Sequence, residues 1–233
     1  QFNVENNKNK FRDKLPNQAF YQDFYWTKDS AFNDLDYLKI ANEVLLDYHA
    51  RKLTGDSGYA DKNFIVEARA GFDYYIITQN KLLSNTSNMY VGGDFRSNAA
   101  SGSNIFYKGA VKYYLYGWNQ NDLIADAIVG YDFGKFGIIS GNATYQLKEA
   151  PYMFERYRSH PVEWGYKLPK TKLFGVGGKY QNIPYGLTAD VNYYVVDHLP
   201  VYPYNTSQYI TTGVENIFVA HFANRNGFYG VHL

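Results

Sequence analysis

The 233-residue chain contains no cysteine, which excludes a disulfide scaffold, a thiol nucleophile and zinc sites built from cysteine. Neither sign of charge dominates: 23 Lys+Arg stand against 22 Asp+Glu, so bulk electrostatics indicate no nucleic-acid partner. No apolar run approaches the ~20 residues of a membrane-spanning helix. The hydropathy does not exclude transmembrane β-strands, because their alternating pattern averages to a polar value. The mean hydropathy here is −0.45.

Aromatic residues, in contrast, are abundant, with 25 Tyr, 16 Phe and 3 Trp. The segment Phe64–Thr78 shows how they are arranged. One parity is apolar or aromatic throughout, whereas the other carries Glu67, Arg69 and Asp73. A period of two sends the two sets to opposite faces of a strand, and a helix would scatter the charges around its circumference. The segment therefore predicts a strand with one apolar and one charged face.

The same alternation recurs along the chain and predicts strands over 105–117, 123–132, 139–147, 174–181, 187–195 and 210–222. Weaker candidates are 18–26, 36–47, 89–97 and 228–233. Turn-like sequences of hairpin type occur at 133–136, 182–186 and 223–227, and longer links at 148–171 and 198–208. Strands of ~10 to 14 residues with short and long connections in alternation are typical of an outer-membrane barrel.

We therefore expect an all-β fold, an antiparallel transmembrane β-barrel with about ten or more strands. A soluble β-sandwich is the alternative, because its strands alternate too. The two differ in what covers the apolar face, which is lipid in the barrel and a second sheet in the sandwich. Long strands, long loops on one side and Tyr pairs near strand ends (74–75, 113–114, 193–194) favour the membrane.

Between Val111 and Asp197 the chain resembles the porin family of Bacteroidota outer membranes. The residues that carry the resemblance are KYYLYG at 112–117, EAPYMFERY at 149–157 and NYYVV at 192–196, in that order. Members of the family look like large single-chain barrels, longer than this chain. The resemblance thus implies an outer-membrane location in a Gram-negative bacterium. It also implies that residues 1–233 form one β-barrel domain that is a portion of a longer porin.

The charged parity supplies candidates that would face a barrel lumen and tune passive diffusion of small hydrophilic solutes or ions. They are Glu67, Arg69, Asp73, Asp94, Arg96, Lys108, Lys112, Asp126, Lys179, Asp190, Glu215 and His221. In the alternative interpretation they pair across strands and fill the interior. The protein would then be a non-enzymatic accessory or structural subunit of a larger outer-membrane complex.

The 148–171 loop offers aromatic and basic side chains that could contact a carbohydrate or a protein, or fold over the barrel mouth: Tyr152, Phe154, Arg156, Tyr157 and Trp164. No motif is catalytic, and the five histidines show no metal-ligand spacing, so we expect neither an enzyme nor a metal or other cofactor. The expected partners are the lipid bilayer and, for an accessory subunit, other outer-membrane proteins.

Overall fold

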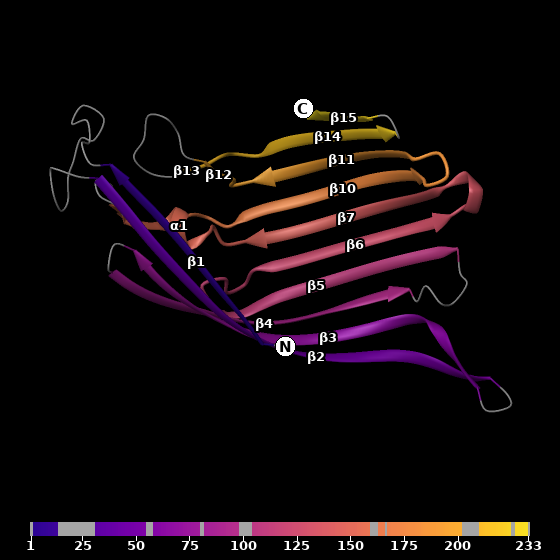
Figure 1. Ribbon diagram of the computed structural model, residues 1–233, viewed down its shortest axis with the longest axis horizontal. Coiled ribbons are helices and arrows are strands. Elements are labelled where there is room, and N and C mark those ends of the chain that lie inside the picture. The colour runs from indigo at the N-terminus through magenta and orange to yellow at the C-terminus, as the bar shows by residue number, and fades with distance from the viewer. Residues whose placement is uncertain are drawn as a thin grey trace.

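The computed structural model describes residues 2–13, 31–54, 58–79, 82–97, 104–158, 163–165, 167–201, 210–224 and 227–232. Eleven strands form one sheet in which every neighbouring pair is antiparallel (Figure 1). In sheet order they are β1 (Phe2–Asp13), β2 (Ala31–Thr54), β3 (Gly58–Gln79), β4 (Leu82–Ser97), β5 (Ile105–Gly117), β6 (Leu123–Asp132), β7 (Ile138–Lys148), β10 (Thr171–Asn182), β11 (Leu187–Asp197), β14 (Glu215–Asn224) and β15 (Gly227–His232). The all-β, barrel-like architecture is confirmed, and the sheet is open, with β1 and β15 at its edges.

Smaller elements lie in the connections, among them the 3-10 helix η2 (Gly134–Phe136) between β6 and β7. The long link after β7 contains the short helix α1 (Tyr152–Glu155) and a hairpin of β8 (Arg156–Arg158) and β9 (Glu163–Gly165). The link after β11 contains the paired strands β12 (Pro200–Val201) and β13 (Ile210–Thr211). The described residues include no helix long and apolar enough to cross a membrane.

Most of the predicted strands are confirmed, several of them with different bounds. β2 and β3 are longer than the alternation predicted, 24 and 22 residues, and their pairing shifts register between His49 and Arg51. The predicted strand 210–222 is wrong as a single element, because Thr211 pairs with Pro200 and β14 begins only at Glu215. The weak candidate at 18–26 lies outside the described residues.

Connection lengths divide the sheet into two ends. At the end where β6 meets β7, only residues 133–137 separate the strands, and 183–186 separate β10 from β11. At the other end lie the long links 14–30, 149–170 and 198–214. This end also holds the tight turn between β5 and β6, so short and long connections do not alternate strictly.

The two parities lie on opposite faces of the sheet, and the apolar face is uncovered. Phe64, Val66 and Phe72 on β3 are 37%, 39% and 43% exposed. The same face of the other strands exposes Val91, Phe95, Val111, Tyr113, Val129, Phe174, Val191 and Phe218. A sandwich would bury these side chains against a second sheet, so that alternative is wrong for the described structure.

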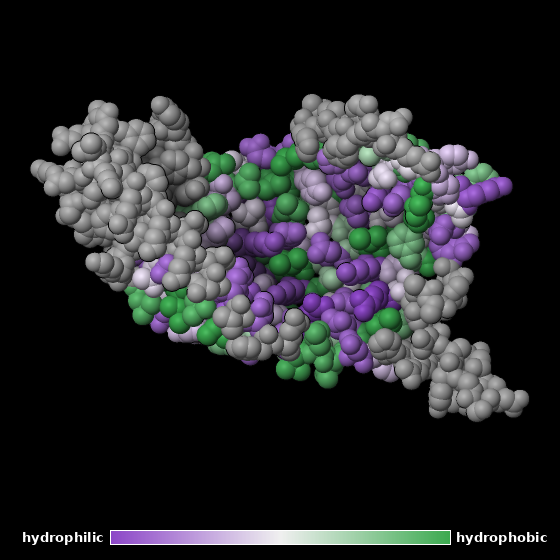
Figure 2. All heavy atoms as spheres, in the orientation of Figure 1, coloured by the Kyte–Doolittle hydropathy of each residue, from purple (hydrophilic) through white to green (hydrophobic). Residues whose placement is uncertain are grey.

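Burial is concentrated among polar side chains instead. Among the described residues, the buried apolar ones are Ile77, Tyr90, Ala150, Leu168 and Val196, whereas the buried polar ones are Asp73, Gln79, Asn88, Asp94, Asp122, Glu149, Glu155 and Asn182. Figure 2 shows hydrophilic side chains gathered over the middle of one face, with hydrophobic ones towards its margins. The organisation is the reverse of a water-soluble domain, where the apolar side chains are buried.

Aromatic rings fill positions where the facing strand has glycine. Gly71 on β3 lies directly opposite Tyr90 on β4. A Cβ at Gly71 would lie 2.2 Å from the Tyr90 ring. Because that space is free, the ring crosses β3 and its hydroxyl donates to Glu43 on β2 at 2.8 Å. The glycine therefore allows a polar contact between strands that are not neighbours.

Replacing Gly71 with alanine should cost about 1–3 kcal/mol of the free energy of unfolding, because the added methyl overlaps the Tyr90 ring. In a Tyr90→Ala background the same substitution should cost little. Urea unfolding of the four lipid-folded proteins of this double-mutant cycle measures the coupling. Equal costs in both backgrounds would contradict the packing described.

Candidate functional site

All twelve candidate lumen residues belong to the parity opposite most of the exposed apolar side chains. They are spread over seven strands: Glu67, Arg69 and Asp73 on β3, Asp94 and Arg96 on β4, Lys108 and Lys112 on β5, Asp126 on β6, Lys179 on β10, Asp190 on β11, and Glu215 and His221 on β14. We call this surface the polar face. That it lines a lumen stays a prediction.

Near the N-terminal half of the sheet, the charges of the polar face pair with one another. Glu67 and Asp94 lie directly opposite in the β3–β4 register, an arrangement that would be repulsive alone. Arg69 lies between them and donates to both carboxylates, reaching Asp94 at 2.5 Å. The three side chains form a compact ion network, so they present less free charge than the sequence indicates.

A second group on this half combines charges with tyrosines. The Asp73 carboxylate pairs with the Lys39 ammonium at 3.3 Å and accepts from the Tyr75 hydroxyl at 3.1 Å. The Lys112 ammonium lies over the Tyr90 ring, 3.4 Å from its centroid. Cation–π contacts of this kind hold a lysine in place without neutralising it. This half of the polar face is therefore crowded and internally paired.

The polar face over β6 to β14 differs, because neutral amide and hydroxyl side chains hydrogen-bond to its acidic ones there. Thr144 donates to Asp126 at 2.6 Å. Asn142 on β7 donates to Asn192 on β11 at 3.3 Å, and Asn192 in turn donates to Asp190 at 3.1 Å. The contacts continue to His221, whose Nδ1 lies 3.0 Å from Asp190. These contacts form a lateral ladder across five adjacent strands.

A hollow of about 560 Å³ opens on this second half of the polar face. It is lined from β5, β6, β7, β10 and β11 by Lys108, Ala110, Asp126, Ala127, Ile128, Asn142, Ala143, Thr144, Gln146, Leu173, Asn192 and Tyr194. Only two of the twelve predicted lumen residues, Lys108 and Asp126, belong to it. The amides and Tyr194 were not predicted, because only charged side chains and a histidine of the polar parity were taken as candidates.

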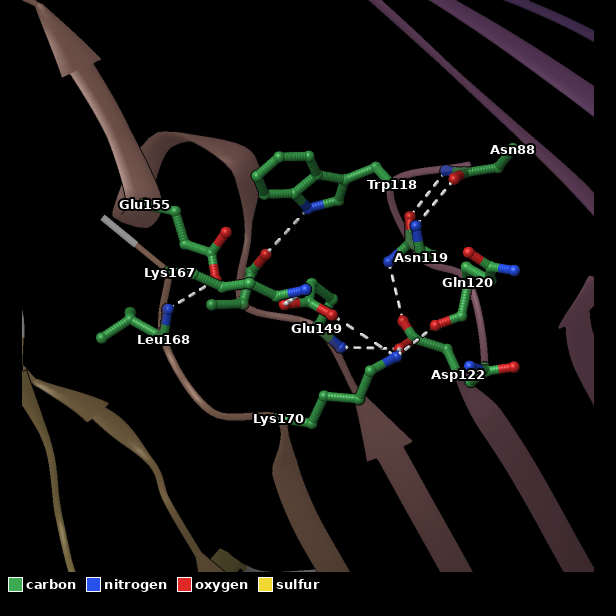
Figure 3. Close-up of polar contacts among 12 residues, drawn as sticks. Asn88, Trp118, Asn119, Gln120, Asp122, Glu149, Glu155, Lys167, Leu168 and Lys170 are labelled. Atoms are coloured by element: carbon green, nitrogen blue, oxygen red, sulfur yellow. Dashed lines mark hydrogen bonds and ion pairs between the residues drawn. The ribbon is translucent and has the colours of Figure 1, made fainter. Parts of the chain in front are cut away.

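Buried polar residues fasten the long link after β7 to the turn between β5 and β6 (Figure 3). Asp122, 1% exposed, accepts from the backbone N–H of Glu149 at 2.8 Å and from Asn119 at 2.8 Å. The Lys170 ammonium pairs with Asp122 at 2.5 Å and with Glu149 at 3.4 Å. Asp122 is thus the centre of a network that joins two connections at the same end of the sheet.

Glu155, at the end of α1, ties two parts of this link together. Its carboxylate accepts from the Leu168 backbone N–H at 2.8 Å. Burial raises the pKa of Glu155 and the charge of Glu149 raises it further, while the Leu168 N–H opposes the shift. Sequence reasoning missed these acids because they lie in connections, where parity gives no signal.

Two of the five loop-contact candidates have described side chains, and the structure gives Tyr152 contacts within the protein. Its ring meets the Trp118 ring edge-on at a centroid distance of 5.0 Å, and its hydroxyl lies 2.6 Å from Ser84 Oγ. Phe154 is partly buried. Arg156 and Tyr157 pair with Gly165 and Trp164 through the backbone, and the side chains of Arg156, Tyr157 and Trp164 lie outside the described residues.

Comparison with known families identifies the chain. A family model described as "putative porin" matches residues 1–211, most of the 233-residue sequence. The chain belongs to this porin family. No curated protein and no solved structure matches it. The predicted porin resemblance is confirmed, whereas the Bacteroidota origin stays a prediction. Membership of a porin family indicates a transport or structural role.

In this porin, Lys170→Met should release the link after β7 from the β5–β6 turn, because it leaves Asp122 buried without its cation. Protection of the Glu149 amide against hydrogen exchange should fall roughly 100-fold, equivalent to about 3 kcal/mol. Lys167→Met is the matched control. The Lys167 side chain is 80% exposed, and its ammonium makes a long contact of 3.9 Å with Glu149. A similar loss of protection in both variants would contradict the network.

Proposed function

We propose that the protein is an outer-membrane β-barrel that allows passive diffusion of small hydrophilic solutes or ions. The observation that carries the proposal is the exposed apolar face of a sheet in a porin-family chain. Exposed Val, Phe and Tyr on successive strands suit contact with lipid. The polar face would then surround water, and Lys108, Asp126, Lys179 and Glu215 would set the local field along the path.

Location and architecture follow from the same proposal. A porin of this kind lies in the outer membrane of a Gram-negative bacterium, here one of the Bacteroidota, with the bilayer as its main partner. In hydrocarbon, every backbone N–H and C=O needs a partner. The outer edges of β1 and β15 therefore have to be closed, by each other or by additional strands of one barrel to which residues 1–233 contribute.

A second candidate function is an accessory or structural barrel whose lumen is closed, in a complex with other outer-membrane proteins. The ion network of Arg69, Glu67 and Asp94 and the paired charges around Asp73 favour it, because paired side chains can fill an interior. Planar-bilayer recording of the purified full-length protein separates the two candidates. Reproducible stepwise conductance supports the pore, and its complete absence supports the accessory barrel.

Adjacent positions on β6 test the proposed orientation. Val129 is 59% exposed on the apolar face, and Ile128 is 42% exposed on the polar face. Val129→Lys should cost roughly 2–4 kcal/mol of unfolding free energy in lipid vesicles, because it places a charge in hydrocarbon. Ile128→Lys should cost much less, since its ammonium meets water. Urea unfolding in vesicles measures both, and an equal or larger cost for Ile128→Lys would contradict the orientation.

A further inference from the structure

The hollow over β5 to β11 combines features of a small-molecule site. Its volume of about 560 Å³ lies within the range of small-molecule sites, ~300–1,000 Å³. The paired charges on β2 to β4 fill their own surroundings, whereas here the strands leave space between polar groups. The hollow therefore has room for a solute in contact with the wall.

Two glycines of β10 let side chains of the neighbouring strands lie over this strand at the border of the hollow. Gly175 and Gly177 lie on the polar face, opposite Thr144 and Asn142 on one side and Tyr194 and Asn192 on the other. A Cβ at Gly177 would lie 2.0 Å from Asn192 Oδ1. A Cβ at Gly175 would lie 2.5 Å from the Tyr194 ring and 2.8 Å from Thr144. On the polar face, the middle of β10 thus carries no side chain, and side chains of its neighbours lie over it.

The side chains that meet over β10 are neutral and rich in both donors and acceptors. Each amide has two N–H donors and an oxygen acceptor. The bond from Asn142 to Asn192 uses one donor of the first and the oxygen of the second. Thr144 orients the Asp126 carboxylate at 2.6 Å, and Gln146 lies 3.5 Å from the Thr144 hydroxyl. The ladder holds its members in fixed orientations, which suits recognition of a solute with many hydroxyls.

Charge and shape narrow the ligand class further. The lining includes one ammonium, Lys108, and one carboxylate, Asp126, so it favours neither anions nor cations. Tyr194 adds an aromatic surface, partly exposed beside the amides. An aromatic ring offers an apolar surface with a polar tip, and sugars combine hydroxyl edges with C–H faces. We propose that the hollow is a binding site for a neutral saccharide of one or two residues.

This inference rests on the proposed function, because a sugar would reach the site through the proposed pore. Sucrose is the probe, titrated into the full-length protein in detergent and followed by calorimetry. The double variant Asn142→Leu/Asn192→Leu should weaken sucrose binding at least tenfold. Gln181→Leu, on the same face of β10 but outside the hollow, is the matched control and should bind as the wild type does.

The contribution of the aromatic ring has its own pair of variants. Tyr194→Phe should keep most of the affinity, because the ring remains, whereas Tyr194→Leu should lose several-fold. Near-ultraviolet circular dichroism checks that each variant is folded. Equal affinities for the two variants would overturn the assigned role of the ring.

Two comparisons make the proposal falsifiable independently of the pore. Glucose 6-phosphate and glycylglycine should bind more weakly than sucrose, and equal or tighter binding of either would overturn the saccharide assignment. Wild-type protein that conducts ions but does not bind sucrose overturns this inference and leaves the pore intact. Sucrose binding that depends on Asn142 and Asn192 in a protein without conductance supports the site and contradicts the pore.

Discussion

Antiparallel backbone pairing is the constraint on which the rest of this structure depends. Eleven strands pair their N–H and C=O groups with their neighbours, the outer edges of β1 and β15 excepted, and a backbone paired in this way can lie in hydrocarbon. Pairing also sends alternate side chains to opposite faces, so the composition of each parity determines the medium that each face suits. Apolar side chains such as Phe72 and Val129 occupy the exposed face, and charged ones such as Asp73 are buried on the other.

Within that constraint, glycines allow side chains of neighbouring strands to lie across a strand on the polar face. At Gly71 the Tyr90 ring crosses the strand, and together with the nearby ion networks it occupies the surface of the sheet. At Gly175 and Gly177 the Tyr194 ring and the Asn192 amide likewise lie over the strand, at the border of the hollow. One half of the polar face is therefore closed by its own charges, while the other keeps space and neutral hydrogen-bonding groups. In the proposed pore, the two halves would give one wall that excludes solute and one that contacts it.

The alternation of the sequence was sufficient to predict the fold class, most strands and the two faces, because a period of two is a local signal. It failed where non-local contacts decide. Residues 47–52 break the alternation, yet pairing with β3 continues β2 to Thr54. Pairing with Pro200 separates Thr211 from β14. The hollow depends on Asn142 and Asn192, 50 positions apart, meeting across β10. That contact follows from the register of β7, β10 and β11, which the sequence does not give. The ion pair of Asp122 and Lys170 likewise joins residues that are distant in the sequence.

The most direct test of the account is a single-cysteine scan of β6, because the chain has no cysteine of its own. Each position from Ile124 to Tyr131 would be labelled, in protein folded into lipid vesicles, with a nitroxide whose collisions with oxygen and with a water-soluble nickel chelate are compared. The account predicts a period of two: odd positions such as Val129 favour oxygen, which is concentrated in lipid, and even positions such as Asp126 favour the chelate. Equal access of the chelate to both sets, or lipid contact at the even positions, would contradict the claim that the apolar face meets the membrane and the polar face meets water.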